Sequence, residues 1–332
     1  GRFYIKKYLK EEFKMGGSRI DSEDVKRYYD THSHIRSATN YNQVFKGSRM
    51  KNEYNPSLMK LPREACDSVD CPHSRGIIYC QDVTGSMGDY SLSLIKNEFP
   101  RLIKLTHESV SYDPHIMYMG VGDVEFDSAP LQVTQFEADL RMLEQLQEIY
   151  IEGGGGSNPY ESYILPWYFA GNHIEMDCYK KRGEKGFLYT FGDELPTPHL
   201  TASQLSKVFG KDELIKTRMV TAEDCLEMAS SKFYCYHVIL HGWYYEHHNK
   251  YDLREQWRDL LGGHVCDLSD HHYLPELVTT ILRMYEGYSK TESLSCISDN
   301  EAKNVVKDAL KWHEEVVVDE KEERKSRNVE LF

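Results

Sequence analysis

The chain has 332 residues and a formal net charge of −13, from 53 acidic and 40 basic side chains. This balance argues against a nucleic-acid-binding protein, because such proteins need clustered Lys and Arg to displace counterions from phosphates. No run reaches the eighteen or so apolar residues that a membrane helix needs, and the first residues lack the apolar core of a secretory signal. With 40% hydrophobic residues, we expect one decorated domain without nucleic-acid or membrane partners.

The cysteines indicate a reducing compartment. There are eight, and their spacing matches no small secreted disulfide framework. Cys80 and Cys235 fall within apolar runs that are typical of buried strands, where a thiol behaves as a small hydrophobic group. We therefore expect a cytoplasmic protein.

The chain divides into three parts. Residues 1–75 are polar and tyrosine-rich, with a helix predicted over 22–30, and we expect this extension to pack on the domain that follows. Over 76–288 strand and helix patterns alternate, which predicts an α/β, Rossmann-like, doubly wound fold with a mostly parallel sheet flanked by helices. Residues 289–332 form a C-terminal extension, with one helix and a tail of mixed charge that is typical of a disordered segment or a partner-binding arm.

Within the domain, the spacing of apolar residues and the positions of turn residues predict individual helices and strands. Helices are expected after residue 88, with a kink or split at Pro100, and over 274–285. Two more are expected to begin at capping boxes, one formed by Thr134 and Glu137 and the other by Ser298 and Glu301. Buried strands are predicted at 76–81, 115–121, 131–133, 185–192, 233–240 and 263–266.

The most informative segment is GIIYCQDVTGSMG at 76–88. It is a short apolar strand followed by Asp82, Thr84 and Ser86, which would lie just past the carboxyl end of the strand. In an open α/β sheet that edge is where ligands bind. One carboxylate and two hydroxyls supply half of the oxygen shell that Mg²⁺ prefers, and the ion would require a further acid from elsewhere. The alternative is an ordinary turn in which Asp82 or Ser86 caps the next helix.

This segment resembles the metal-ion-dependent adhesion site of von Willebrand factor A domains, whose first loop reads Asp-x-Ser-x-Ser with Ser or Thr at the hydroxyl positions. The resemblance implies two further loops. EGGGGSNPYE at 152–161 places Ser157 where the family has a Thr, and KGFLYTFGDE at 185–194 supplies an acid after a strand. The family has Thr-Asp-Gly there, so the acid is displaced. Asp193 is the expected ligand, and Glu194 is the alternative.

The wider match covers about residues 60–288 and is similar to bacterial intracellular von Willebrand A proteins whose function is mostly unassigned. It is carried by LPRE at 61–64, APLQV at 129–133, QFE at 135–137 and the segment 180–194. The resemblance implies a von Willebrand A fold and a bound Mg²⁺ or Mn²⁺ that accepts an Asp or Glu carboxylate from a protein partner. By analogy with relatives, that partner is a MoxR-type AAA+ ATPase and the chain is a non-enzymatic adaptor.

A metal-dependent hydrolase is the first alternative, because Mg²⁺ also polarises phosphoryl oxygens and activates water. The loops offer Asp89, Asp123 and Glu161 as bases, but no neighbouring Arg or Lys pair to hold a phosphate. Asp123 and Asp127 fit loop and capping positions better. No Walker-type phosphate loop is present, so we do not expect an NTPase.

A zinc-stabilised structural protein is the second alternative. Cys66, Cys71 and His73 bring three potential ligands together, although structural zinc sites have four ligands and closer cysteine pairs. His237 lies within a strand pattern and is expected to be a hydrogen-bonded core residue. For most of the remaining histidines, surface or core roles are favoured over metal binding, and these include His241, His247, His248, His264, His271 and His272.

Overall fold

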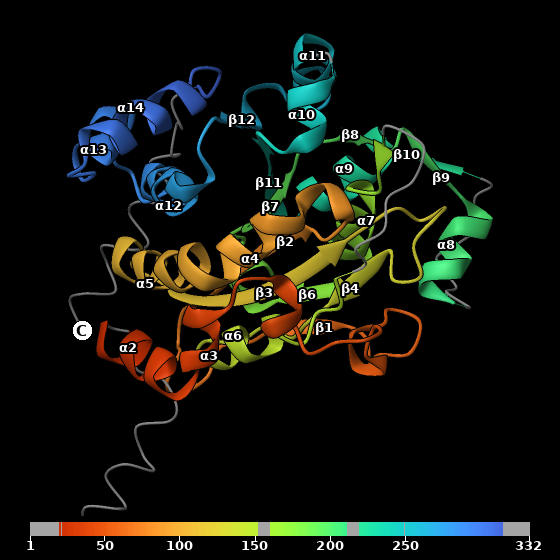
Figure 1. The fold of residues 1–332 in the computed structure, drawn as a ribbon, viewed down its shortest axis with the longest axis horizontal. Helices are drawn as coiled ribbons and strands as arrows, with labels where there is room; N and C mark the ends of the chain where they lie inside the picture. The colour runs from red at the N-terminus through yellow and green to blue at the C-terminus, as the bar shows by residue number, and fades with distance from the viewer. Residues whose placement is uncertain (1–19, 21, 152–159, 211–218, 249, 315–332) are drawn as a thin grey trace, which may run out of the picture.

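The computed structural model describes residues 20, 22–151, 160–210, 219–248 and 250–314. Its centre is a six-stranded sheet in the order β12-β11-β7-β2-β3-β4 (Figure 1). All neighbouring strands are parallel except β4, which is antiparallel to β3. The strands are β2 (Ser74–Asp82), β3 (Asp113–Val121), β4 (Leu131–Val133), β7 (Gly186–Gly192), β11 (Phe233–Leu240) and β12 (Val265–Leu268). The predicted doubly wound α/β fold is confirmed.

Both faces of the sheet are buried, because successive side chains of each strand enter two different apolar clusters. In β2, Ile77 and Tyr79 belong to one cluster, and Ile78 and Cys80 belong to the other. Helices covering the first face are α2 (Ser22–Thr31), α3 (Ser33–Ser37), α4 (Gly88–Ser93), α5 (Phe99–Ser109), α6 (Arg141–Leu146), α12 (Leu274–Tyr285) and α14 (Asn300–Ala309). Those on the second face are α7 (Ile164–His173), α8 (Ala202–Phe209), α9 (Ala222–Ser230), α10 (Trp243–His247) and α11 (Lys250–Leu261).

Short elements complete the fold. Three two-stranded pairs join β1 (Arg63–Ala65) to β6 (Ile174–Met176), β5 (Tyr160–Glu161) to β8 (Leu195–Pro196), and β9 (His199–Thr201) to β10 (Met219–Thr221). The remaining helical turns are η1 (Tyr41–Gln43), η2 (Asn52–Tyr54), η3 (Gly85–Met87), η4 (Leu94–Glu98), η5 (Cys178–Arg182), η6 (Gly262–His264), η7 (His271–Tyr273) and α13 (Lys290–Ser295). No described helix is long and apolar enough to cross a membrane.

Two predicted helix starts are wrong. Thr134 does not cap a helix; its hydroxyl instead accepts a hydrogen bond from the Tyr118 amide, 2.9 Å away, on the neighbouring strand. Helix α6 therefore begins only at Arg141. The last helix, α14, is capped by Asp299, whose carboxylate accepts from the Glu301 and Ala302 amides, and not by Ser298.

Two other predictions need less adjustment. The helix that contains Pro100 is interrupted as expected, because the π-helical segment η4 separates α4 from α5 directly before the proline. The last strand, expected at 263–266, runs from Val265 to Leu268.

The N-terminal residues share the core of the sheet. Tyr28, Tyr29 and Ile35 are buried in the same cluster as Ile77 and Tyr79 of β2. Their aromatic and aliphatic surface is removed from water only through this packing, so the helices α2 and α3 depend on the domain for their stability.

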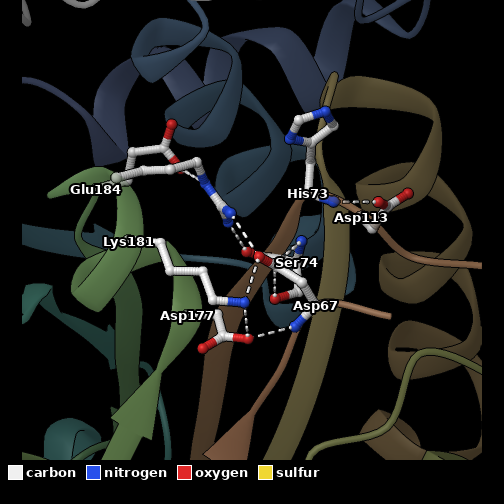
Figure 2. A network of polar contacts seen from close by, with 8 residues as sticks. Asp67, His73, Ser74, Asp113, Asp177, Lys181 and Glu184 are labelled. Carbon is white, nitrogen blue, oxygen red and sulfur yellow. Dashed lines mark hydrogen bonds and ion pairs between the residues drawn. The ribbon is translucent and has the colours of Figure 1, made fainter. Parts of the chain in front are cut away.

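A polar network fixes the start of β2, as Figure 2 shows. The carboxylate of Asp67 accepts hydrogen bonds from the amide and hydroxyl of Ser74, at 3.1 and 2.8 Å, and from Arg182 Nη1 at 2.9 Å. The Asp67 amide in turn donates to Asp177 Oδ2 at 2.8 Å, and Lys181 lies between the two acids. Although burial alone would raise the pKa of Asp67, these partners hold it at about 2.

We predict that Asp67→Asn lowers the free energy of unfolding by about 1–2 kcal/mol at pH 7, because hydrogen bonds to a charged group are lost. The pKa of Asp67 is lowered in the folded state, so its contribution is present above about pH 4 and lost as pH falls towards about 2. Urea unfolding at several pH values should show the difference from wild type shrinking over that range. Asp70→Asn, at an exposed acid of the same loop, should leave stability unchanged; an equal loss in both variants would contradict the assignment.

Candidate functional site

The sheet reverses its winding direction at β2. In chain order, its six strands follow the pattern 3-2-1-4-5-6, and the reversal lies between β2 and β7. Ligands of open α/β sheets bind at the carboxyl ends of the strands flanking such a point. Asp82 is the last residue of β2, and Asp193 directly follows β7. Both carboxyl groups are fully buried there.

Asp82 is held on both oxygens. Its Oδ1 accepts hydrogen bonds from the amide and hydroxyl of Thr84, at 2.9 and 2.6 Å. Its Oδ2 accepts from the Tyr163 hydroxyl at 2.7 Å. Tyr163 fits only because residue 192 is glycine: a Cβ there would lie 1.8 Å from the Tyr163 oxygen.

Asp193 lies against the start of α10. Its Oδ2 accepts a hydrogen bond from the Tyr244 amide at 2.7 Å. A Cβ on Gly242 would lie 2.4 Å from the same oxygen. The backbone at Gly242, which follows β11, therefore lies so close to the Asp193 carboxylate that only glycine fits there.

A third acid, Glu161, joins this group through a strand pair. It ends β5, which runs parallel to β8, and its carbonyl accepts hydrogen bonds from the amide and hydroxyl of Thr197 at 3.0 and 3.1 Å. Since β8 begins two residues after Asp193, this pairing places Glu161 near the other acids. The Glu161 side chain is buried, and its Oε2 has no hydrogen-bond partner among the described residues.

These carboxyl groups repel one another. Burial, reinforced by the charge of Asp193, raises the pKa of Asp82 to about 6. Burial and then the charges of Asp82 and Glu194 raise the pKa of Glu161 far above its usual range. Within the described part of the chain, no Lys, Arg or His forms an ion pair with Asp82 or Glu161.

Asp267, at the end of β12, shows the opposite arrangement. It is also buried, but it is paired with His241 Nε2 and Arg254 Nε at 2.7 Å each, and with Lys311 at 3.5 Å. Burial would raise its pKa, yet the hydrogen bond with His241 and the charges of Arg254 and Lys311 keep the pKa of Asp267 below its usual range. At this edge of the sheet, basic side chains therefore balance the charge of Asp267. The charges of Asp82 and Glu161 would have to be balanced by a proton or a bound cation.

The donor set at the switch point fits a hard divalent cation. Side-chain oxygens of Asp82, Thr84, Asp193 and Glu161 are present, and oxygen donors suit Mg²⁺, Mn²⁺ and Ca²⁺. No three carboxylate oxygens of the described acids there lie within 4.8 Å of one another. A shared ion would therefore be held partly through water, as Mg²⁺ commonly is.

Of the five predicted metal ligands, Asp82, Thr84 and Asp193 are buried at this edge. Ser86 lies in η3, the turn that follows β2, while Ser157 lies outside the described residues. Glu194, the alternative to Asp193, is half-buried, and its carbonyl accepts from Trp257 Nε1 at 3.0 Å.

Sequence reasoning missed two members of this group. Glu161 was considered only as a catalytic base, and Tyr163 was assigned no role. The available signal was an acid between the glycines of the segment 152–161 and the apolar run 163–170.

The other candidate residues lie apart from this group. All eight cysteines are free, and Cys66, Cys71 and His73 do not form a three-ligand group among the described residues. His237 is a core residue as predicted: it is fully buried, and its Nδ1 lies 2.8 Å from the Thr190 hydroxyl. Asp123 and Asp127 accept backbone amides of their own loop, consistent with the loop role.

Comparison with known proteins adds little. No family model and no curated protein matches the chain. Among solved structures, it is similar to the pilus adhesin SpaC from Lactobacillus rhamnosus GG in its open conformation, with 10% identity and a TM-score of 0.40. The match covers 74% of this chain and 31% of the adhesin. At that score it carries no argument about fold or function.

We predict that the metal-free protein loses stability as pH rises. The pKa of Asp82 is raised in the folded state, so its contribution is favourable below about pH 4 and lost as pH rises through about 6. A tenfold change in the acid dissociation constant of Asp82 on folding corresponds to about 1.4 kcal/mol in the free energy of unfolding. Asp82→Asn should flatten the stability curve over this range relative to wild type, measured by urea unfolding in a chelator. If the free energy of unfolding depends on pH in the same way in both proteins, Asp82 does not carry an unbalanced charge in the folded state.

We predict that adding Mg²⁺ or Mn²⁺ raises the free energy of unfolding. At ten times its dissociation constant, a bound ion contributes about 1.4 kcal/mol to the free energy of unfolding. We expect this gain to increase with pH and to disappear in Asp82→Asn and Asp82→Ala. Thermal unfolding with and without each ion checks the prediction, and a full gain in either variant would place the ion elsewhere.

Gly242→Ala tests the packing around Asp193 without removing a ligand. The new Cβ must displace the carboxylate, so we expect the affinity for Mg²⁺ to fall about tenfold or more. Gly171→Ala is the matched control, because its Cβ would meet Met228 at 2.7 Å, where α7 packs against α9. If the control loses Mg²⁺ affinity equally, general destabilisation and not the site explains the effect.

Proposed function

We propose that the chain is a divalent-metal-dependent protein-interaction module, in which Mg²⁺ or Mn²⁺ at the switch point accepts a carboxylate from a partner protein. The observation that carries the proposal is the group formed by Asp82, Asp193 and Glu161, buried at the ligand-binding edge of the sheet. Asp82 and Glu161 form no ion pair with a base among the described residues, so they need either protons or a cation. Their oxygen chemistry favours a hard cation.

The arrangement of Asp82 explains why a partner's carboxylate is the expected ligand. Both of its oxygens already accept hydrogen bonds, from Thr84 and Tyr163. An ion that is bound directly by neutral hydroxyls, and by carboxylates only through water molecules, keeps most of its positive charge. It therefore favours an additional anionic oxygen as a ligand. The resemblance of residues 82–86 to the adhesion site of von Willebrand A domains supports the same conclusion. An Asp or Glu side chain of another protein supplies that oxygen.

The proposal extends to the class of partner. By the resemblance to bacterial intracellular von Willebrand A proteins, the partner is a MoxR-type AAA+ ATPase, and this chain is its adaptor. This step rests on analogy between families, since a fold alone does not determine function.

A metal-dependent hydrolase is the second candidate, and one observation favours it. His241 is oriented by Asp267, at 2.7 Å, and directly precedes Gly242, which packs against Asp193. A histidine oriented by a carboxylate is the usual form of a general base. Under this reading His241→Ala would abolish a Mg²⁺-dependent hydrolysis of phosphate esters, whereas under the interaction reading no hydrolysis is found in either protein.

Affinity capture from the native host tests the interaction. We expect an AAA+ ATPase to be retained in millimolar Mg²⁺ and released by a chelator, because the ion bridges the two proteins. Thr84→Ala should prevent capture, and Thr31→Ala, at an exposed threonine of α2, should not. Equal capture in the chelator would refute metal dependence. Metal-dependent capture without an ATPase would refute the adaptor role alone.

A further inference from the structure

A second group of potential ligands lies away from the switch point. Glu98, His271 and His272 each offer one ligand atom, and the three atoms lie within 4.8 Å of one another. Within the described residues, this is where three such side chains of His, Cys, Asp or Glu converge. Glu98 ends η4, directly before α5, and the histidines begin η7, directly before α12. Helices α5 and α12 pack against each other on one face of the sheet (Figure 1).

Local backbone structure brings these side chains together. The π-helical segment η4 widens the helix just before α5, and such segments occur often at functional sites. On the other side, Asp270 caps η7 by accepting the His272 amide at 2.9 Å. Arg101 donates to the His272 carbonyl at 2.9 Å and is itself ion-paired with Glu276, so its charge is already balanced.

Both imidazoles have a nitrogen available. His271 Nε2 is buried without a hydrogen-bond partner among the described residues, and its ring centroid lies 4.5 Å from that of Tyr90. Burial lowers the pKa of His271 to about 4, so the ring is neutral near pH 7. His272 Nδ1 lies 2.8 Å from Asp270 Oδ1, which leaves Nε2 for another ligand.

We propose that Glu98, His271 and His272 form a binding site for Zn²⁺ or a similar transition-metal ion, with Asp270 as the residue that orients His272. Two imidazoles and one carboxylate form a ligand set typical of zinc with one coordination position left open. A carboxylate that accepts the second N–H of a ligand histidine is the usual support of such a site. Magnesium, which prefers oxygen ligands, does not suit it.

The present separation of the ligand atoms is compatible with this ion. Ligands at zinc–ligand distances of about 2.0–2.2 Å in tetrahedral geometry stand about 3.3–3.6 Å apart. Atoms within 4.8 Å can reach that spacing through side-chain rotation, because His272 is more than half exposed.

Such an ion would join two segments far apart in the sequence. The helix α4–η4–α5 follows the first predicted metal loop, and α12 is the last helix of the domain. Zinc bound at Glu98, His271 and His272 would fix the amino-terminal ends of α5 and α12 to each other. The Zn²⁺ site shares no ligand with the Mg²⁺ site and requires no partner protein.

Zinc titration of the chelator-treated full chain tests the proposal. Millimolar Mg²⁺ is included so that the oxygen site is filled, and binding is measured by calorimetry. We expect one Zn²⁺ per chain. His272→Ala removes a ligand from the surface and should weaken binding by at least about 100-fold, and Asp270→Asn should weaken it by about 10–100-fold. Co²⁺ in place of Zn²⁺ should show the visible bands of a tetrahedral ion, lost in His272→Ala.

Two controls keep the outcome clear. Glu98→Gln keeps the size of the buried side chain but lowers its ligand strength, so weaker binding with an unchanged thermal unfolding profile supports the site. His34→Ala, at an exposed histidine of α3, should bind Zn²⁺ as wild type does. The proposal is overturned if the wild type binds no Zn²⁺, or if His272→Ala and Glu98→Gln bind it as tightly as wild type.

Discussion

The constraint on which the rest of the site depends is the burial of like charges at one edge of the sheet. Asp82 and Asp193 end neighbouring strands, and the β5–β8 pair adds Glu161. Their mutual repulsion opposes folding, whereas the surrounding backbone forces them together. Gly192 and Gly242 make this possible, because at both positions a Cβ would overlap the groups that contact the acids. Buried acids with raised pKa values cluster at functional sites more often than elsewhere, which makes this edge of the sheet the candidate site.

Two ways of accommodating a buried acid occur at the carboxyl edge of this one sheet. Asp267 is balanced by His241, Arg254 and Lys311, and its pKa is lowered. Asp82 receives only neutral hydrogen-bond donors, and its pKa is raised. Since both lie at carboxyl ends of strands in one sheet, burial alone does not explain the difference. The absence of a paired cation at Asp82, among the described residues, separates a structural acid from a candidate metal ligand.

The sequence predicted the strands that follow from a local pattern of apolar residues. It missed the residues whose positions depend on contacts between distant parts of the chain. The strands at 131–133 and 233–240 were placed correctly, because short apolar runs between turn residues have few other solutions. Asp82 followed from the end of such a strand, whereas Asp193 followed from the resemblance to the third loop of von Willebrand A domains. Glu161 did not, because its position depends on a two-residue pairing with β8. The prediction that Thr134 caps a helix was wrong for a similar reason. Its hydroxyl accepts a hydrogen bond from the amide of Tyr118 on β3, a contact that the local sequence does not reveal.

The two candidate metal groups are joined by a short series of contacts through Tyr90. Its ring packs on His271, and its hydroxyl donates to the carbonyl of His241. His241 precedes Gly242, which leaves no room beside Asp193. Tyr90 therefore contacts both the segment that carries His271, directly before α12, and the backbone that bounds Asp193. Because protein interiors are close-packed, the side chain of Tyr90 fixes the spacing between these two segments.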